Sequence, residues 1–307
     1  MCRMAIDRLI EAIERKKNPT VLGLDPRPDH IPPSVTEKHT AKHGQTLKAL
    51  QGAYKEYVFT LMDALRDLVP AVKFQSACYE ALGPGGMEVM RQGVLWARNL
   101  GLFVIIDGKR GDIGSTSEAY SAAFLGRTQA GDALLPVFDA DALTVNPYLG
   151  SDNLTPFLKD CETYDKMVFV LVKTSNKSSV EVQELTAGDR PLYRVVAEQV
   201  SRAGRHLAGQ YGYLKTGIVA GATQPAALRQ LRKDHPELFF LVPGYGEQGG
   251  KAEDLAPAFD RHGRGALVNN SRGICRAWKK SGTADYADAA RKAAARMRDE
   301  LKKAILL

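Results

Sequence analysis

Eight runs of apolar and β-branched residues recur along the chain, each ending in Gly, Pro, Asn, Ser or a charged residue. Most are continuously hydrophobic, such as Phe103–Ile106 and Met167–Val172, and do not alternate with polar residues. Continuous runs of this kind are typical of strands that are buried on both faces of a parallel sheet. The predicted strands are Thr20–Pro26, Ala71–Ala77, Leu102–Lys109, Ala142–Leu149, Lys166–Thr174, Gly217–Thr223, Leu238–Gly244 and Gly265–Ser271.

Segments with helical periodicity lie between these strands. In Leu47–Val69 the apolar residues recur every three or four positions and form one stripe. Regular alternation of strand and helix favours an α/β fold, a (β/α)8 TIM barrel, over a doubly wound sheet. Further helices are predicted over Met87–Leu100, Ser117–Phe124, Leu192–Leu207, Pro225–Leu231 and Ala252–Phe259, with an amphipathic helix around Ile6–Ile13 and a terminal helix over Ala284–Leu306.

The lengths of the connections indicate how the domain is organised. A chain of 307 residues fits a single barrel domain, 1–307, with modest insertions. The first connection (Arg27–Pro70) and the fifth (Ser175–Thr216) are long, so we expect insertions there over the barrel mouth. No linker divides the chain.

Composition narrows the classes of partner. An apolar content of 44% with 25% charged residues is ordinary for a globular domain. The net charge of +7 suits an anionic substrate, but no cluster of basic and aromatic residues predicts a nucleic-acid partner. No apolar run is long enough to predict a membrane span. Four scattered cysteines (Cys2, Cys78, Cys161 and Cys275) predict reduced, mostly buried thiols of a cytoplasmic protein.

The strongest chemical signal follows the third strand. Asp107 and Lys109 are two residues apart, so on a strand they share a face, and they fall where barrel enzymes carry their catalytic groups. Asp112 could return a second carboxylate to the same ammonium. Charge spacing alone favours a surface turn, but these residues emerge directly from an apolar strand, where an unpaired charge is costly.

The run Asp107-Gly-Lys109-Arg-Gly-Asp112-Ile113, followed by Thr116, resembles the signature of the orotidine 5′-monophosphate decarboxylase family, in its longer bacterial branch. The resemblance covers nearly the whole chain. It includes the segments Leu22–Asp25, Val72–Gln75, Val172–Asn176, Val219–Pro225, Pro243–Gly246 and Asn270–Ile274. One departure is Ser271, which stands where the family usually has Gly before its phosphate-binding Arg.

The resemblance implies a function and a set of site residues. The function is conversion of orotidine 5′-monophosphate (OMP) to uridine 5′-monophosphate (UMP) and CO2 in de novo pyrimidine biosynthesis, by a homodimer whose active sites are shared across the interface. It implies neither a metal nor an organic cofactor. The catalytic residues would be Lys109, Asp107, Asp112 and Lys73, and the substrate would be bound by Asp25, Ile113, Thr116, Ser175, Pro243, Gln248, Gly249 and Arg272.

The residue types suit this chemistry. Loss of CO2 leaves a carbanion at C6 of the pyrimidine, and a fixed ammonium stabilises that charge and then supplies a proton. Lys109 would do both, held protonated by flanking carboxylates. Glycines after the seventh strand and a bidentate Arg272 suit the phosphate.

Three alternatives differ in class. The related 3-keto-L-gulonate 6-phosphate decarboxylases and hexulose-phosphate synthases share Asp-x-Lys-x-x-Asp, but they have Ala-Gly after it and an acidic metal ligand upstream. Here Ile113 follows Asp112, and the strand before Asp107 is apolar. Gly244-x-Gly246-x-x-Gly249 matches a dinucleotide fingerprint, but it lies too late in the chain for such a domain. The third alternative is a non-catalytic phosphosugar-binding barrel.

Overall fold

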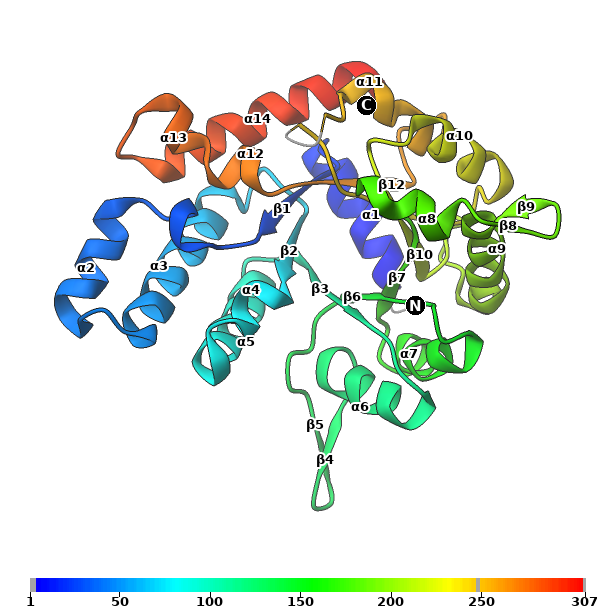
Figure 1. The fold of residues 1–307 in the computed structure, drawn as a ribbon, viewed down its shortest axis with the longest axis horizontal. Coiled ribbons are helices and arrows are strands. Elements are labelled where there is room, and N and C mark those ends of the chain that lie inside the picture. Colours follow the sequence, from blue (N-terminus) through cyan, green and yellow to red (C-terminus); the bar gives the residue numbers. More distant parts are fainter. Residues whose placement is uncertain (1–3, 247–248, 306–307) are drawn as a thin grey trace.

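The computed structural model describes residues 4–246 and 249–305, and it contains a closed barrel of eight parallel strands (Figure 1). Around the barrel the strand order is β1-β12-β11-β10-β7-β6-β3-β2. The predicted (β/α)8 barrel is therefore confirmed. Its strands are β1 (Thr20–Leu24), β2 (Ala71–Gln75), β3 (Phe103–Arg110), β6 (Ala142–Val145), β7 (Met167–Lys173), β10 (Thr216–Ala220), β11 (Phe240–Val242) and β12 (Ala266–Asn270).

Each observed strand overlaps its predicted run, and most end earlier. The apolar pattern continues into loops at the barrel mouth, where residues such as Pro243 and Gly244 line the pocket instead of extending β11. The sequence pattern therefore overestimated strand length at the carboxyl ends, where side chains are buried without being paired in the sheet.

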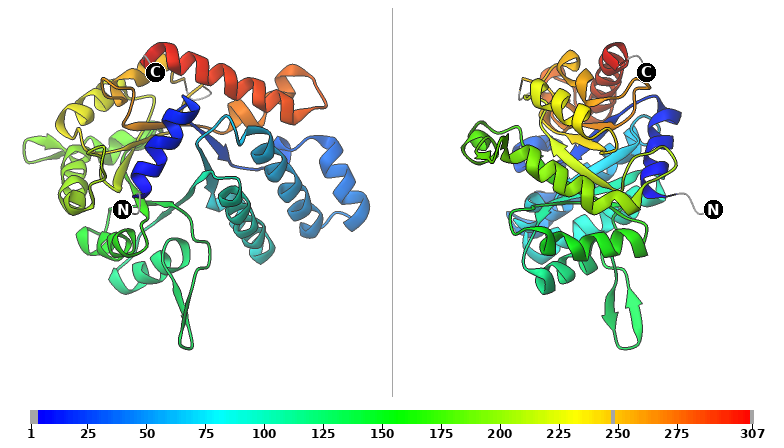
Figure 2. Two further views of the ribbon diagram at one scale, coloured as in Figure 1. Left: turned by 180° about the vertical axis from the view of Figure 1, so that it is seen from behind. Right: turned by 90° about the vertical axis from the view of Figure 1, so that its right-hand side faces the viewer.

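Helices surround the barrel (Figures 1 and 2). The predicted helix Leu192–Leu207 is α9 followed by a 3-10 turn, and the predicted helix Ala252–Phe259 is the short α11 followed by another. The longer helices that follow strands are α3 (Leu47–Leu65), α5 (Gly83–Asn99), α6 (Gly114–Phe124), α7 (Ser151–Thr163), α9 (Leu192–Gly204), α10 (Pro225–Asp234) and α14 (Tyr286–Ile305). Short ones are α4 (Ser76–Glu80), α8 (Val180–Gln183), α11 (Ala252–Leu255), α12 (Arg272–Cys275) and α13 (Ala277–Ser281), and the 3-10 turns are η1 (Pro28–His30), η2 (Lys177–Ser179), η3 (Arg205–Leu207) and η4 (Ala256–Ala258).

The two long connections, the first and the fifth, hold extra elements. The first contains η1 and α2 (Pro33–His43), which packs against α3 at one side of the molecule (Figure 1). The fifth contains η2, α8 and a small hairpin of β8 (Thr186–Ala187) and β9 (Arg190–Pro191). A second hairpin, β4 (Thr128–Ala130) with β5 (Ala133–Leu135), extends from the body between α6 and β6. Of the two long connections, only the fifth lines the pocket among the described residues, through residues up to Gln183.

Helix α1 (Ala5–Lys16) covers the amino-terminal end of the barrel, as seen from behind in Figure 2. Its apolar face, which includes Ile6 and Ile10, packs with the side chains inside the barrel, such as Val21 and Ile105. The predicted amphipathic helix is thereby confirmed. Because this end is closed by an apolar contact, the open end of the barrel lies at the carboxyl ends of the strands.

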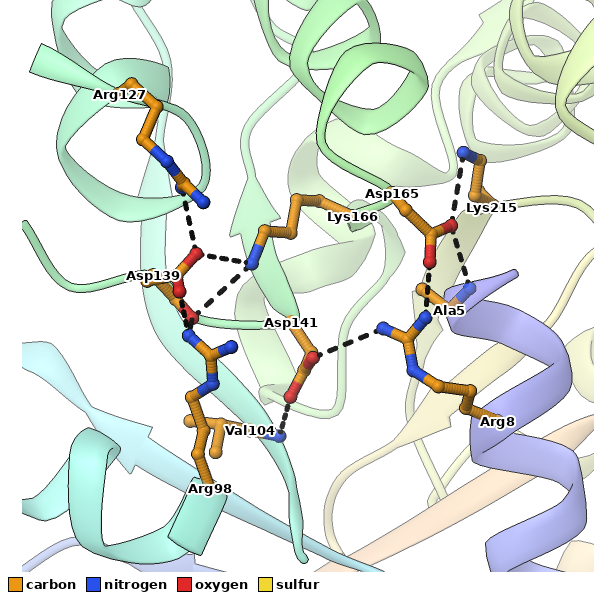
Figure 3. A network of polar contacts seen from close by, with 10 residues as sticks. All are labelled: Ala5, Arg8, Arg98, Val104, Arg127, Asp139, Asp141, Asp165, Lys166 and Lys215. Atoms are coloured by element: carbon orange, nitrogen blue, oxygen red, sulfur yellow. Dashed lines mark hydrogen bonds and ion pairs between the residues drawn. The ribbon is translucent and has the colours of Figure 1, made fainter. Parts of the chain in front are cut away.

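Polar contacts also hold this end together (Figure 3). Asp139 binds three basic side chains: Arg127 at 2.9 Å, Lys166 at 2.8 Å, and Arg98. Asp141 accepts a hydrogen bond from the Val104 backbone N–H at 2.9 Å. The network ties the segments before β6 and β7 to α1, which joins it through Arg8.

The cysteines that the structure describes are unpaired with one another. Cys161 and Cys275 are buried, Cys78 is half-buried, and all three are free thiols, whereas Cys2 lies outside the described residues. Within 4–246 and 249–305, no helix is both long and apolar enough to cross a membrane.

Candidate active site

A cavity of about 470 Å³ opens at the carboxyl ends of the strands. Its floor follows from the alternation of side chains along each strand. Ala71, Ile105 and Leu267 are buried and point into the barrel. The next inward position on each of these strands, two residues later, is polar and lines the cavity: Lys73, Asp107 and Asn269 respectively. The floor therefore changes from apolar to polar within one layer of the barrel.

A row of alternating charges occupies this floor. The Nζ of Lys73 lies 3.0 Å from Asp107 Oδ2 and 3.2 Å from Asp25 Oδ1. The Nζ of Lys109 lies 2.6 Å from the other oxygen of Asp107. The Lys73 side chain is only 4% exposed, whereas that of Lys109 is 44% exposed. Lys109 is therefore the cation at the open end of the row, and Lys73 is the buried one.

The row keeps its buried members ionised. Burial alone would lower the pKa of Lys73, but the carboxylates of Asp107 and Asp25 more than reverse this, and its pKa lies above the ordinary value. Burial alone would raise the pKa of Asp107, but Lys73 and Lys109 hold it well below its usual range. At neutral pH the floor consequently carries an ionised Asp107 beside the ammonium of Lys73.

An irregular strand end holds Lys109 in place. Pairing of β3 with β6 is regular at Ile106–Leu143 and resumes only at Arg110–Val145. Within this bulge Lys109 has φ +47°, a left-handed conformation that side chains rarely adopt. Thr144 bridges the bulge: its hydroxyl accepts from the Lys109 backbone N–H at 2.9 Å and donates to Asp107 Oδ1 at 2.8 Å. Thr144 thus fixes both the backbone and the carboxylate partner of Lys109.

Ser175 lies on the pocket wall that follows β7. It sits against Gly221, where an added Cβ would lie 2.8 Å from the Ser175 backbone. The neighbouring Thr174 and the more distant Gln183 line the same wall and are hydrogen-bonded to each other. This wall therefore offers several polar groups to a ligand.

The loops after β11 and β12 form another side of the pocket. Pro243, Gly244, Tyr245 and Arg272 all line it. Gly249 has φ +94°, a conformation suited to glycine, and is not among the lining residues, whereas the predicted contact Gln248 lies outside the described residues. The Tyr245 hydroxyl donates to Glu300 of α14, so this loop is attached to the terminal helix.

Asp112, Ile113 and Thr116 do not line the pocket of their own chain among the described residues. An Asp112 carboxylate oxygen accepts a hydrogen bond from the next backbone N–H, that of Ile113, at 2.7 Å. Ile113 is 61% exposed. The idea that Asp112 returns to Lys109 within one chain is therefore wrong for this structure, because the bulged strand end and the start of α6 carry the segment away from the cavity.

The sequence reasoning missed several pocket residues. Thr144 and Asn269 are polar residues within otherwise apolar strands, and that signal could have identified them, since a buried polar group requires a partner. Gln75 extends the inward face that begins at Lys73. Gln183 gave no such signal. It lies in a connection, and the periodicity of the sequence does not determine the path of a connection.

The residues upstream of Asp107 bear on the metal-dependent alternative. Val104, Ile105 and Ile106 are fully buried and apolar, so this strand supplies no acidic ligand before Asp107. In the described part of the chain, no group of three or more His, Cys, Asp and Glu side chains is placed to hold a metal ion.

Comparison with known proteins gives a consistent answer. The profile of the orotidine 5′-phosphate decarboxylase / HUMPS family matches residues 21–286. The orotidine 5′-phosphate decarboxylase of Caldicellulosiruptor bescii is 40% identical over 299 residues, covering 97% of this chain and 98% of that protein. That of Rhodopirellula baltica is 40% identical over 301 residues, covering 96% and 98%. Among solved structures, the OMP decarboxylase of Leishmania donovani is similar, with a TM-score of 0.74 at 31% identity and coverage of 99% and 100%.

Proposed function

This chain belongs to the orotidine 5′-phosphate decarboxylase / HUMPS family, and from that premise we propose how its pocket acts. The chain is a carboxy-lyase that converts OMP to UMP and CO2 in pyrimidine biosynthesis. We assign the roles of the residues from one observation: the row of charges Asp25–Lys73–Asp107–Lys109 at the carboxyl ends of the barrel strands.

In the proposed mechanism Lys109 is the catalytic group. The bond between C6 and the carboxylate breaks, CO2 leaves, and the electron pair remains on C6. The Lys109 ammonium stabilises this charge as it forms and donates its proton to C6, after which water reprotonates the amine. Asp107 aims the ammonium of Lys109 from 2.6 Å, and Lys73 holds the other oxygen of Asp107 at 3.0 Å.

The rest of the pocket would bind the nucleotide. Asp25 and Lys73 are proposed to contact the ribose, and Ser175 the pyrimidine. Pro243, Gln248, Gly249 and Arg272 are proposed to surround the phosphate. Binding of the remote phosphate and ribose can then be used to orient the ring over Lys109. These steps use the chain's own side chains.

Asp112, Ile113 and Thr116 are proposed to act in the pocket of a second copy. Ile113 is exposed, Asp112 and Thr116 are half-buried, and none of the three lines the cavity of its own chain, which supports a homodimer with shared sites. The chain, 1–307, would then be a single barrel domain that acts in the cytoplasm as one half of that dimer.

Replacing Lys109 with Ala tests the assigned role. Wild-type protein mixed with OMP should cause the loss of ultraviolet absorbance that accompanies formation of UMP. The variant should lose nearly all turnover and retain most of its affinity for UMP, because the ammonium is needed most when carbanion charge develops. Inactivity of the wild type would refute the function, whereas ordinary turnover by the variant would refute only the role of Lys109.

A further inference from the structure

Lys173, the last residue of β7, is a fully buried lysine that the proposed mechanism does not use. Its Nζ lies 2.8 Å from Glu184 Oε1 and 3.5 Å from the hydroxyl of Ser179, which is itself buried. The same nitrogen lies 5.8 Å from the ring centre of Tyr193 on α9. A buried ammonium is costly unless it is paired. Lys173 is therefore strongly held to the connection that follows it.

A bulge explains why this side chain is not in the pocket. Leu171 lines the pocket, and strict alternation from it would direct Lys173 inward as well. The pairing with β10 shifts at this point: Val219 pairs with Leu171, but the next residue, Ala220, pairs with Lys173. Bulges redirect side chains. At this bulge the Lys173 side chain contacts the segment that follows the strand and does not line the cavity.

That segment, residues 174–184, forms one wall of the pocket. Thr174, Ser175, Asn176 and Gln183 from it line the cavity. The segment is closed on itself by Gln183, whose Oε1 accepts from the Thr174 backbone N–H at 2.9 Å and whose Nε2 donates to the Thr174 hydroxyl at 2.8 Å. Glu184, the ion-pair partner of Lys173, directly follows Gln183. The buried ammonium thus fastens the far end of the wall to the strand where the wall begins.

We propose that Lys173 is a positioning residue: through Glu184 and Ser179 it holds the 174–184 wall in the place where that wall recognises the pyrimidine. This inference rests on the proposed function, which assigns Ser175 to the base. Lys173 itself touches neither the cavity nor the reacting atoms. Its effect should therefore fall on the base end of the ligand and leave the sugar-phosphate end unchanged.

The test compares two ligands on the Lys173→Met variant, which removes the charge and keeps the length of the side chain. The Kd for UMP should rise about tenfold, as expected when the groups that contact one end of a ligand are displaced. The Kd for ribose 5-phosphate, which lacks the base, should stay within about twofold of the wild-type value, and this also reports that the variant is folded. Lys177→Met makes the same chemical change at an exposed position of the wall and should alter neither Kd.

Glu184→Gln supplies a second route, because it weakens the ion pair from its half-exposed side and does not depend on Lys173→Met folding. Like Lys173→Met, it should raise the Kd for UMP and leave the Kd for ribose 5-phosphate unchanged. Unchanged UMP affinity in both variants, or equal losses for UMP and ribose 5-phosphate, would overturn the inference. Failure of the wild type to turn over OMP would instead refute the proposed function.

Discussion

Thr144 shows how one side chain can hold a strained catalytic geometry. It is 1% exposed, and its hydroxyl serves both the Lys109 backbone and the Asp107 carboxylate. Lys109 adopts φ +47° without the freedom of glycine, so this conformation must be maintained by its surroundings. Thr144 is the residue that closes the ring of contacts from the Lys109 amide, through Asp107, to the Lys109 ammonium.

Replacing Thr144 with Val should therefore impair catalysis more than binding. The change preserves shape but leaves the Lys109 amide without its partner and Asp107 without one donor. We expect kcat to fall by about 10- to 100-fold, because small misplacements of a catalytic group are costly, and the Kd for UMP to change by less than about threefold. Steady-state kinetics and calorimetry measure the two quantities.

Thr144→Ser is the matched control for this prediction. It retains the hydroxyl and loses only a methyl group, so kcat should remain within a few-fold of the wild-type value. A valine variant as active as the serine variant would show that the hydroxyl does not position Lys109.

At the scale of elements, the polar network around Asp139 shows what the closed end of the barrel contributes (Figure 3). Burial alone would raise the pKa of Asp139, but hydrogen bonds from Lys166 and Arg98 lower it from 3.8 to about 2. Lys166 is itself buried, with 5% of its side chain exposed. Removing the Asp139 carboxylate would leave the Lys166 ammonium with little opposite charge to offset the cost of its burial.

Asp139→Asn should lower the free energy of unfolding at neutral pH by about 3 kcal/mol. Because the folded-state pKa of Asp139 is depressed, its contribution is present above the ordinary value of 3.8 and is lost as the pH falls toward 2. The stability difference between wild type and variant should therefore be constant from pH 7 to 5 and shrink between pH 4 and 2. Urea unfolding across this range measures it.

The exposed Asp132 on the β4–β5 hairpin provides the control, since Asp132→Asn makes the same change at a solvent-exposed position. It should alter the stability little at any pH. An Asp139→Asn difference that is as large at pH 3 as at pH 7 would contradict the ionic origin.

The elements that could be predicted from the sequence are those with one buried face. The eight barrel strands and α3, α5, α9 and α14 gave clear patterns because packing selects their apolar positions. The β4–β5 hairpin gave none, since both of its strands are exposed and nothing constrains their alternation. Helix α7 was obscured by Pro156, which lies inside it and usually marks a helix boundary.

The same limit applies to the candidate site. Lys73, Asp107 and Lys109 could be assigned to the pocket because strand alternation and the family resemblance agree. The wall contributed by Gln183 depends on hydrogen bonds between residues nine apart, which no periodicity encodes. The path of Asp112 depends on the bulge at the end of β3, and one sequence does not reveal a bulge.

At the scale of the whole molecule, the loops after β3 and β6 form a joined, exposed surface. Asn153 of α7 ties them together: its Oδ1 accepts from the Asp112 backbone N–H at 3.0 Å and its Nδ2 donates to the Asn146 carbonyl at 2.6 Å. Ile113 on the first loop is 61% exposed, and Tyr148 on the second is 83% exposed. Exposed apolar residues beside a polar segment favour burial against another protein. A second copy of the chain, with a pocket that receives Asp112, would bury these exposed apolar residues.

Mixing two inactive variants, Lys109→Ala and Asp112→Ala, tests whether the sites are shared. If each pocket takes Lys109 from one chain and Asp112 from the other, a mixed dimer has one pocket that lacks both residues and one that is intact. Random exchange makes half of the dimers mixed, so about a quarter of wild-type activity should return. If both residues served the same chain, every pocket would remain defective. No recovery of OMP turnover, once native mass spectrometry has shown that mixed dimers formed, would therefore reject the shared site.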